Sequence, residues 1–192
     1  MKETMSYLAG LFYVAAFLPY VHAILQKKTK PKRATWIVWA SLDIITLAAM
    51  YKTDTVNWQI LGATVGALIV AGLSLKFGIP GWKKLDKLCL AGAILGIAFW
   101  KTFSSPTLGI MISLCVGFLG SFPTFESAWK HPERENKWAW TIFWISCVFA
   151  VIAIRHWTLD DAAQPIMFLV IETIMMYILF VHARSLVKRK TR

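Results

Sequence analysis

Cysteine, histidine and acidic residues are scarce in this chain of 192 residues, which has three Cys, four His and ten Asp or Glu. Cys89, Cys115 and Cys147 lie in three separate apolar runs, with no CxxC or Cys/His spacing. This pattern excludes a zinc site and a disulfide framework. We interpret the three cysteines as apolar packing residues.

Sequence motifs of catalysis are also missing. The chain has no glycine-rich nucleotide loop, no HExxH helix and no nucleophile elbow. A catalytic triad cannot be assembled from its spacings. We therefore expect no metal, no cofactor and no enzymatic activity.

Apolar residues are abundant instead. They make up 57% of the chain, the mean hydropathy is +0.56, and ten residues are Trp. A soluble domain is about half apolar, and Trp concentrates at membrane–water boundaries. The composition therefore predicts a membrane protein.

Seven apolar runs divide the sequence, and most are about as long as a membrane-spanning helix, which needs ~20 residues. Strands of a membrane barrel would be only about 10 residues long. We predict an all-α membrane protein of seven transmembrane helices, at residues 5–25, 34–51, 58–75, 85–100, 108–125, 138–154 and 162–181.

Positive charge lies almost entirely on one side of these seven runs. The loops at 26–33, 76–87 and 130–137 and the C-terminal tail hold 17 of the 21 Lys and Arg. The positive-inside rule puts this side in the cytoplasm and the N-terminus outside, in a multi-pass protein of the cell (plasma or inner) membrane. The net charge of +11 then sets topology and contacts with lipid headgroups, and we expect no nucleic-acid partner.

An internal repeat appears when the first three runs are placed on the last three at an offset of 104 residues. Pro19 then falls on Pro123, Trp36 on Trp140, and the basic loops coincide. This predicts a 3+1+3 arrangement: a three-helix repeat at 1–78, a linker helix at 79–104, and a second repeat with a basic tail at 105–192. Parallel repeats of this kind occur in transporters.

The chain resembles the SWEET and PQ-loop superfamily, whose architecture bacterial nicotinamide riboside transporters share. The resemblance lies in the three-helix repeats, the cytoplasmic prolines Pro19 and Pro123, the segments 30–39 and 123–136, and the outside N-terminus. These segments also resemble a family of small bacterial membrane proteins of about this length. The Pro-Gln pair of the PQ-loop is replaced by Pro-Tyr and Pro-Thr, so the resemblance implies a SWEET-like fold but no particular substrate.

Two acids lie midway along spans, where ionisable groups are costly and usually functional. They are Asp43 and Glu172. Trp36, Trp39 and Asp43 share one helical face, and Trp140 and Trp144 form a similar face. We predict a substrate site of aromatic faces and buried acids, made by Trp36, Trp39, Asp43, Trp140, Trp144 and Glu172. The alternatives are an interfacial Trp belt and structural hydrogen bonds of the two acids.

His22 and Glu126 each follow the repeated proline by three residues. With Pro19 and Pro123 as hinges, they could pair across the two halves as a cytoplasmic gate or proton relay. The alternative is two ionisable groups wetted at the membrane interface.

Together these patterns favour a transporter of a small polar solute, such as a sugar or a nucleoside- or vitamin-like metabolite. It would work by alternating access, with or without proton coupling through Asp43 or Glu172. The rival hypothesis is a non-transporting receptor or accessory subunit that uses the same cavity. The sequence leaves the oligomeric state open.

The charge asymmetry predicts which loops an impermeant thiol reagent reaches in intact cells. In a cysteine-free background, we expect outside labelling of single cysteines at Lys52, Lys101 and His156. We expect protection at Lys28, Lys84 and Arg134. Labelling at position 84 from outside would mean that the run at 85–100 does not cross.

Overall fold

The computed structural model describes residues 1–82 and 84–184, and helices account for nearly all of this part. Seven α-helices occur there: α1 (Lys2–Leu25), α2 (Arg33–Lys52), α3 (Trp58–Phe77), α4 (Lys84–Phe103), α5 (Pro106–Lys130), α6 (Lys137–Ala153) and α7 (Leu159–Met176). A 3-10 turn, η1 (Pro132–Arg134), precedes α6, and a π-helical segment, η2 (Tyr177–His182), continues α7.

The prediction of an all-helical membrane protein is confirmed. Five of the described helices are long and apolar enough to span a bilayer: α1, α2, α3, α5 and α7 with η2. α6 is a shorter apolar helix of 17 residues. The chain is therefore a multi-pass helical membrane protein. Lys83 and the basic tail 185–192, which belong to the predicted cytoplasmic charge, lie outside the described residues.

Side-chain caps fix where several of these helices begin. The side chain of Asn57 accepts from the backbone N–H of Ile60 at 3.0 Å, and that of Asn136 accepts from Ala139 at 3.1 Å. Both caps satisfy a donor that the first turn of α3 or α6 leaves free. Asn136 also donates to the carbonyl of Pro19 at 3.2 Å, which fixes the start of α6 against α1.

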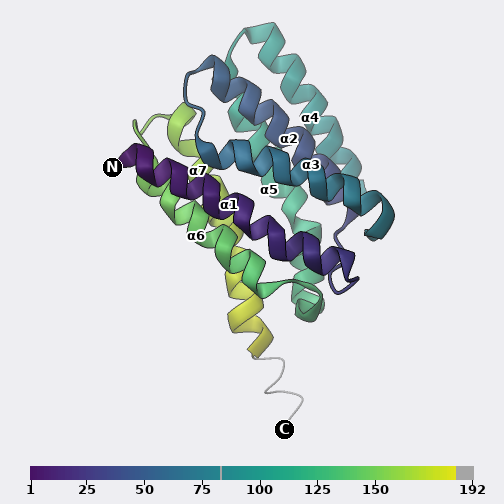
Figure 1. Ribbon diagram of the computed structural model, residues 1–192. Helices are drawn as coiled ribbons and strands as arrows, with labels where there is room; N and C mark the ends of the chain where they lie inside the picture. The colour runs from purple at the N-terminus through teal and green to yellow at the C-terminus, as the bar shows by residue number, and fades with distance from the viewer. Residues whose placement is uncertain (83, 185–192) are drawn as a thin grey trace.

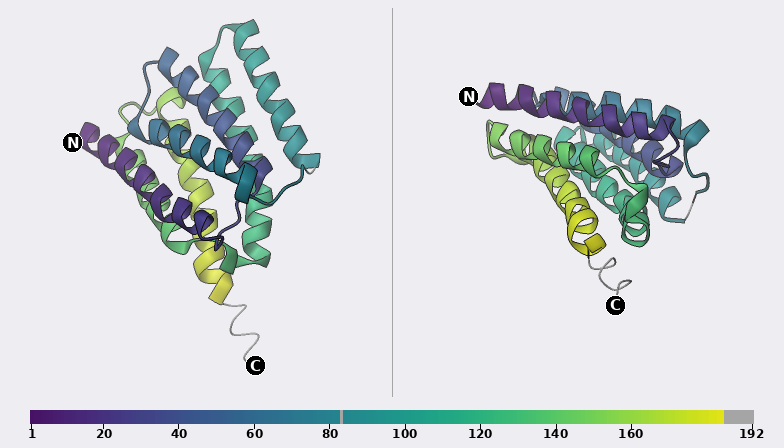
Figure 2. Two further views of the ribbon diagram at one scale, coloured as in Figure 1. Left: turned by 45° about the vertical axis from the view of Figure 1, so that its right-hand side comes forward. Right: turned by 60° about the horizontal axis from the view of Figure 1, so that its bottom comes forward.

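Helices α1 and α6 run side by side in opposite directions along most of their lengths (Figure 1, Figure 2). The Asn136–Pro19 bond joins one end. Ser146 donates to the carbonyl of Ala9 at 2.6 Å, and Lys2 to that of Arg155 at 3.1 Å. Residue numbers rise on one helix as they fall on the other, so the pair is antiparallel.

The remaining helices pack around this pair in a regular way. α3 contacts α1 and α2, α7 contacts α5 and α6, and α2 contacts α5. α4 lies at the edge of the bundle, against α5 and α2 (Figure 1). The loops after α1 and α3 meet as well, since Ile79 donates to the carbonyl of Pro31 at 2.9 Å and accepts from Arg33 at 3.2 Å. Two of the basic loops thus lie together.

Close contact between α1 and α3 depends on small residues of α3. The Cα of Gly66 faces the ring of Phe17, and a Cβ built at Gly66 would overlap that ring. Gly62 lies one turn earlier, against Val14 of α1. Small residues spaced four apart let two membrane helices approach closely, so this pair sets the distance between α1 and α3.

Adding one methyl group at Gly66 should therefore destabilise the bundle. We expect Gly66→Ala to cost about 1–3 kcal/mol, as overpacking does, and to lower the unfolding temperature in detergent. Gly72→Ala is the matched control, because a Cβ at Gly72 meets no atom within 4 Å and alanine favours helix. Equal unfolding temperatures for the two variants would contradict this account of the α1–α3 contact.

Candidate functional site

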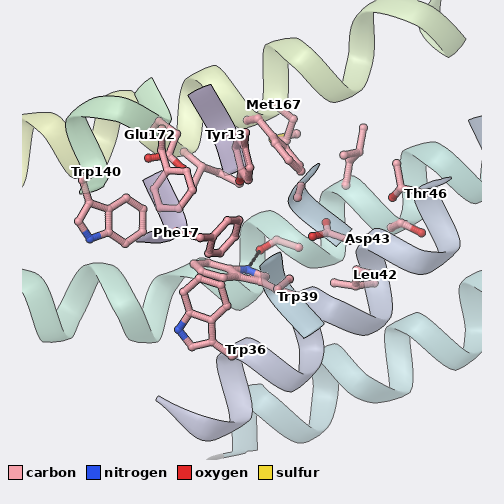
Figure 3. Close-up of a pocket in the computed structure, with 18 residues that line it drawn as sticks. Tyr13, Phe17, Trp36, Trp39, Leu42, Asp43, Thr46, Trp140, Met167 and Glu172 are labelled. Carbon is pink, nitrogen blue, oxygen red and sulfur yellow. Dashed lines mark hydrogen bonds between the residues drawn. The ribbon is translucent and has the colours of Figure 1, made fainter. Parts of the chain in front are cut away.

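A central cavity of about 60 Å³ lies between six of the helices (Figure 3). One water molecule needs roughly 10–15 Å³, so the cavity has room for about four to six. Its lining is largely aromatic. Seven rings contribute to it: Tyr13, Phe17, Trp36, Trp39, Trp140, Phe143 and Phe168.

The structure brings five of the six predicted site residues together at this cavity. Trp36, Trp39 and Asp43 line it from α2, as their shared helical face predicts, and the rings of the two tryptophans pack edge to face with centroids 5.1 Å apart. Trp140 of α6 and Glu172 of α7 complete the set. Figure 3 shows Glu172 on the side of Trp140 and Asp43 on the opposite side of the rings, near Thr46.

The sixth predicted site residue, Trp144, is not part of the lining of this cavity. Its indole N–H donates to the hydroxyl of Thr173 at 3.0 Å, on the side where α6 meets α7. The aromatic face of α6 that lines the cavity therefore continues from Trp140 to Phe143, three residues on, and Trp144 lies beside it.

Aromatic residues of α1 contribute to the cavity, and the sequence reasoning did not name them. The ring of Phe143 lies 4.8 Å from that of Tyr13 and 4.9 Å from that of Phe17, centroid to centroid. Tyr20 continues the same stripe and is buried against Trp36 and Trp140. The spacing of Tyr13, Phe17 and Tyr20 at i, i+4 and i+7 was a signal that could have identified this face.

The polar groups of the cavity are mostly acceptors or hydroxyls. Glu172 is 5% exposed, and neither its Oε2 nor the hydroxyl of Ser113 has a hydrogen-bond partner. Asp43 is half-buried. Two indole donors are already used: Trp39 donates to the carbonyl of Gly117 at 3.3 Å, and Trp140 to a carboxylate outside the cavity. Among the described residues, no Lys, Arg or His lines the cavity.

Many of the lining residues are spaced by the 104-residue offset of the predicted repeat. Ten of them form five pairs that are 104 positions apart in sequence, each pair on corresponding helices: Tyr13 and Gly117, Trp36 and Trp140, Trp39 and Phe143, Ala63 and Met167, Ala67 and Ile171. The contact of Tyr13 with Phe143 and that of Gly117 with Trp39 correspond under the same offset. Residues from both halves of the chain, at positions 104 apart, therefore line the same cavity.

A chain of buried hydrogen bonds crosses the bundle at one end of the cavity. Asn57 donates to Gln164 at 2.8 Å, Gln164 to Gln59 at 3.0 Å, Gln59 to Ser146 at 3.1 Å, and Ser146 to the carbonyl of Ala9. We call Asn57, Gln59, Gln164 and Ser146 the amide layer. It satisfies polar groups that would otherwise be costly inside a membrane bundle.

The amide layer separates the central cavity from a second one of about 340 Å³ at the N-terminal end of α1. Along α3, Asn57 lines the second cavity, Gln59 lies in the layer, and Ala63 lines the central cavity. Three other helices repeat this order: Ser6, Ala9 and Tyr13 on α1; Ala150, Ser146 and Phe143 on α6; Asp161, Gln164 and Met167 on α7.

At the opposite end, Glu135 holds the indole of Trp140. Its carboxyl group accepts from the indole N–H at 3.0 Å. Burial raises the pKa of Glu135 from 4.5 to about 7, and the hydrogen bond from Trp140 opposes that rise. The neutral acid is therefore favoured in the folded protein below neutral pH.

The four predicted gate and hinge residues lie near this end. Pro19 and Pro123 fall inside α1 and α5. His22 is exposed and bonds Gln26 at 2.6 Å, one turn further along α1. Glu126 is exposed and pairs with Lys130 one turn further along α5 (both side chains about half exposed or more). A gate formed by His22 and Glu126 stays a prediction.

Comparison with models of protein families, with curated proteins and with solved structures finds no match for this chain. We therefore infer its function from the geometry of the cavity.

The raised pKa of Glu135 predicts how its contribution to stability depends on pH. A group whose pKa is higher in the folded state than in the unfolded state stabilises the folded protein at low pH. This stabilisation is lost as the pH rises through the pKa of the folded state. Relative to Glu135→Gln, the parent should therefore lose up to about 3 kcal/mol between pH 4.5 and 7.5. Unfolding temperatures of both proteins in detergent across this range test it.

Glu133→Gln is the control for that series, because it removes an exposed acid two residues away. Parent and Glu135→Gln curves that run parallel across the range would show that Glu135 keeps its charge in the folded protein.

Proposed function

We propose that this protein is a transporter of a small solute that works by alternating access around the central cavity. It would have seven spans, with the N-terminus outside, and two three-helix units at 1–78 and 105–184 joined by α4. The observation that carries the proposal is the pairing of cavity residues 104 positions apart. A site between equivalent faces of two repeats is the arrangement of transporters whose halves rock about a midplane site.

The helix contacts support two equivalent units. α3 packs on α1 and α2 in the first unit, as α7 packs on α5 and α6 in the second. Between the units, α1 packs on α6 as α5 packs on α2. Each unit thus keeps its own internal contacts, and the two meet along two similar helix pairs, which is the geometry that lets two rigid bodies rotate against each other.

The amide layer is suited to act as the gate on the N-terminal side. Gln59 belongs to the first unit, whereas Gln164 and Ser146 belong to the second, so rocking of the units must break these bonds. When one of these side-chain hydrogen bonds breaks, water or a solute can replace it at little net cost in free energy, since a typical hydrogen bond contributes only about 1 kcal/mol. Such a layer can close the cavity on this side and still open at a small cost in free energy.

Asp43 and Glu172 come from different units and reach the same cavity. Each can gain or lose a proton when the cavity opens to water on one side. Proton coupling through these two acids is therefore the form of the mechanism that we favour.

Alternating access predicts that one cavity position becomes reachable from both sides of the membrane. We expect Ser113→Cys, in a background without Cys89, Cys115 and Cys147, to react with an impermeant thiol reagent in right-side-out and in inverted vesicles. Val65→Cys is the control and should react in neither, because Val65 is 58% exposed on a face that meets lipid in a membrane-spanning helix. Reaction of Ser113→Cys from one side alone would indicate a receptor with a fixed cavity instead.

A further inference from the structure

We propose that the solute of the central cavity is a small organic cation, held by Glu172 and Asp43 and by the faces of the surrounding aromatic rings. This inference rests on the proposed function, because it names the substrate class of the same site.

The first argument is the state of Glu172. This residue lines the cavity (Figure 3), is only 5% exposed, and has an Oε2 atom without a hydrogen-bond partner. Its titratable neighbours are Tyr13 and Tyr20 of α1 and Cys147 of α6, which carry no positive charge. A buried carboxylate is costly unless a cation or a proton compensates it. A cationic solute supplies that compensation when it enters the cavity.

The second argument is the charge balance of the lining. Two carboxyl groups and no Lys, Arg or His line the cavity in the described part of the chain. An anionic solute would meet repulsion with nothing to offset it. A neutral polyol would need donors as well as acceptors; the indole donors of Trp39 and Trp140 are already bonded to protein, and the free hydroxyl of Ser113 can donate one bond. The charged groups of the lining are both acids, which suits a solute that brings positive charge.

The third argument is the shape of the apolar part. The cavity is lined by seven aromatic rings from four helices. The face of an aromatic ring attracts a cation within about 6 Å, and desolvation strengthens this attraction. Aromatic cages with a nearby acid are how proteins recognise alkylated ammonium groups. The volume of about 60 Å³ limits the solute to a small head group of this kind.

The experiment compares solutes of similar size and different charge. Choline and tetramethylammonium are the cationic probes, 3,3-dimethylbutan-1-ol is the neutral isostere of choline, and 3,3-dimethylbutanoate is the anion. The unfolding temperature of the purified chain is measured in detergent against the concentration of each, in a potassium phosphate buffer free of amines. We expect a saturable rise with the cations, at concentrations roughly tenfold below any effect of the neutral isostere, and none with the anion.

Variants assign the effect to the cavity. Glu172→Gln should remove the shift caused by choline, Asp43→Asn should weaken it, and Glu172→Asp should restore part of it. Glu133→Gln, which removes an exposed acid outside the cavity, should leave the shift unchanged. The unfolding temperature of each variant without solute shows whether that variant folds. If Glu172→Gln does not fold, the comparison of Glu172→Asp and Asp43→Asn with the parent still tests the proposal.

Equal responses to choline and its neutral isostere would overturn the proposal, and so would a full choline response in Glu172→Gln. Absence of any shift with both cations would overturn it too. None of these results touches the transport proposal, because two-sided labelling of Ser113→Cys is measured without a solute.

Discussion

Polar groups inside a membrane bundle must find partners within the protein, and the interior of this molecule is organised by that constraint. The amide layer meets it fully, because the amides of Asn57, Gln59 and Gln164 bond one another across α3 and α7. Glu172 of α7 and Ser113 of α5, which line the cavity, do not meet this constraint, because the Oε2 of Glu172 and the hydroxyl of Ser113 have no hydrogen-bond partner. Groups with hydrogen-bond partners thus lie at one level of the bundle, and groups without partners lie at the level of the cavity.

Aromatic packing gives the cavity its form. The rings of Tyr13, Phe17, Trp36 and Phe143 contact one another through tilted and edge-to-face arrangements. Such rings can present either an edge or a face to a solute without losing all of their mutual contacts. Because the rings come from both halves of the chain, the shape of the cavity depends on how the two halves pack against each other.

Much of the fold could be predicted from local patterns. The predicted spans differ from the observed helices by a few residues at each end, because apolar length and flanking Lys and Arg determine where a helix can cross a membrane. Asp43, Trp36 and Trp39 were predicted as one face because helical periodicity is a local property. The same periodicity groups Trp144 with Trp140, but Trp144 bonds Thr173 of α7, and Phe143 is the next aromatic residue of α6 that lines the cavity.

The sequence by itself determined the helices, their order, the clustering of positive charge in alternate connections and the candidate acids within the helices. Only the tertiary structure decided which faces meet. Gln59 and Gln164 are 105 positions apart, and their hydrogen bond exists because α3 and α7 converge at one level. Gly66 brings α3 close to Phe17, and the position of that ring shapes the cavity. Periodicity fixes a face within a helix, whereas the partner of that face depends on packing against helices far away in the chain.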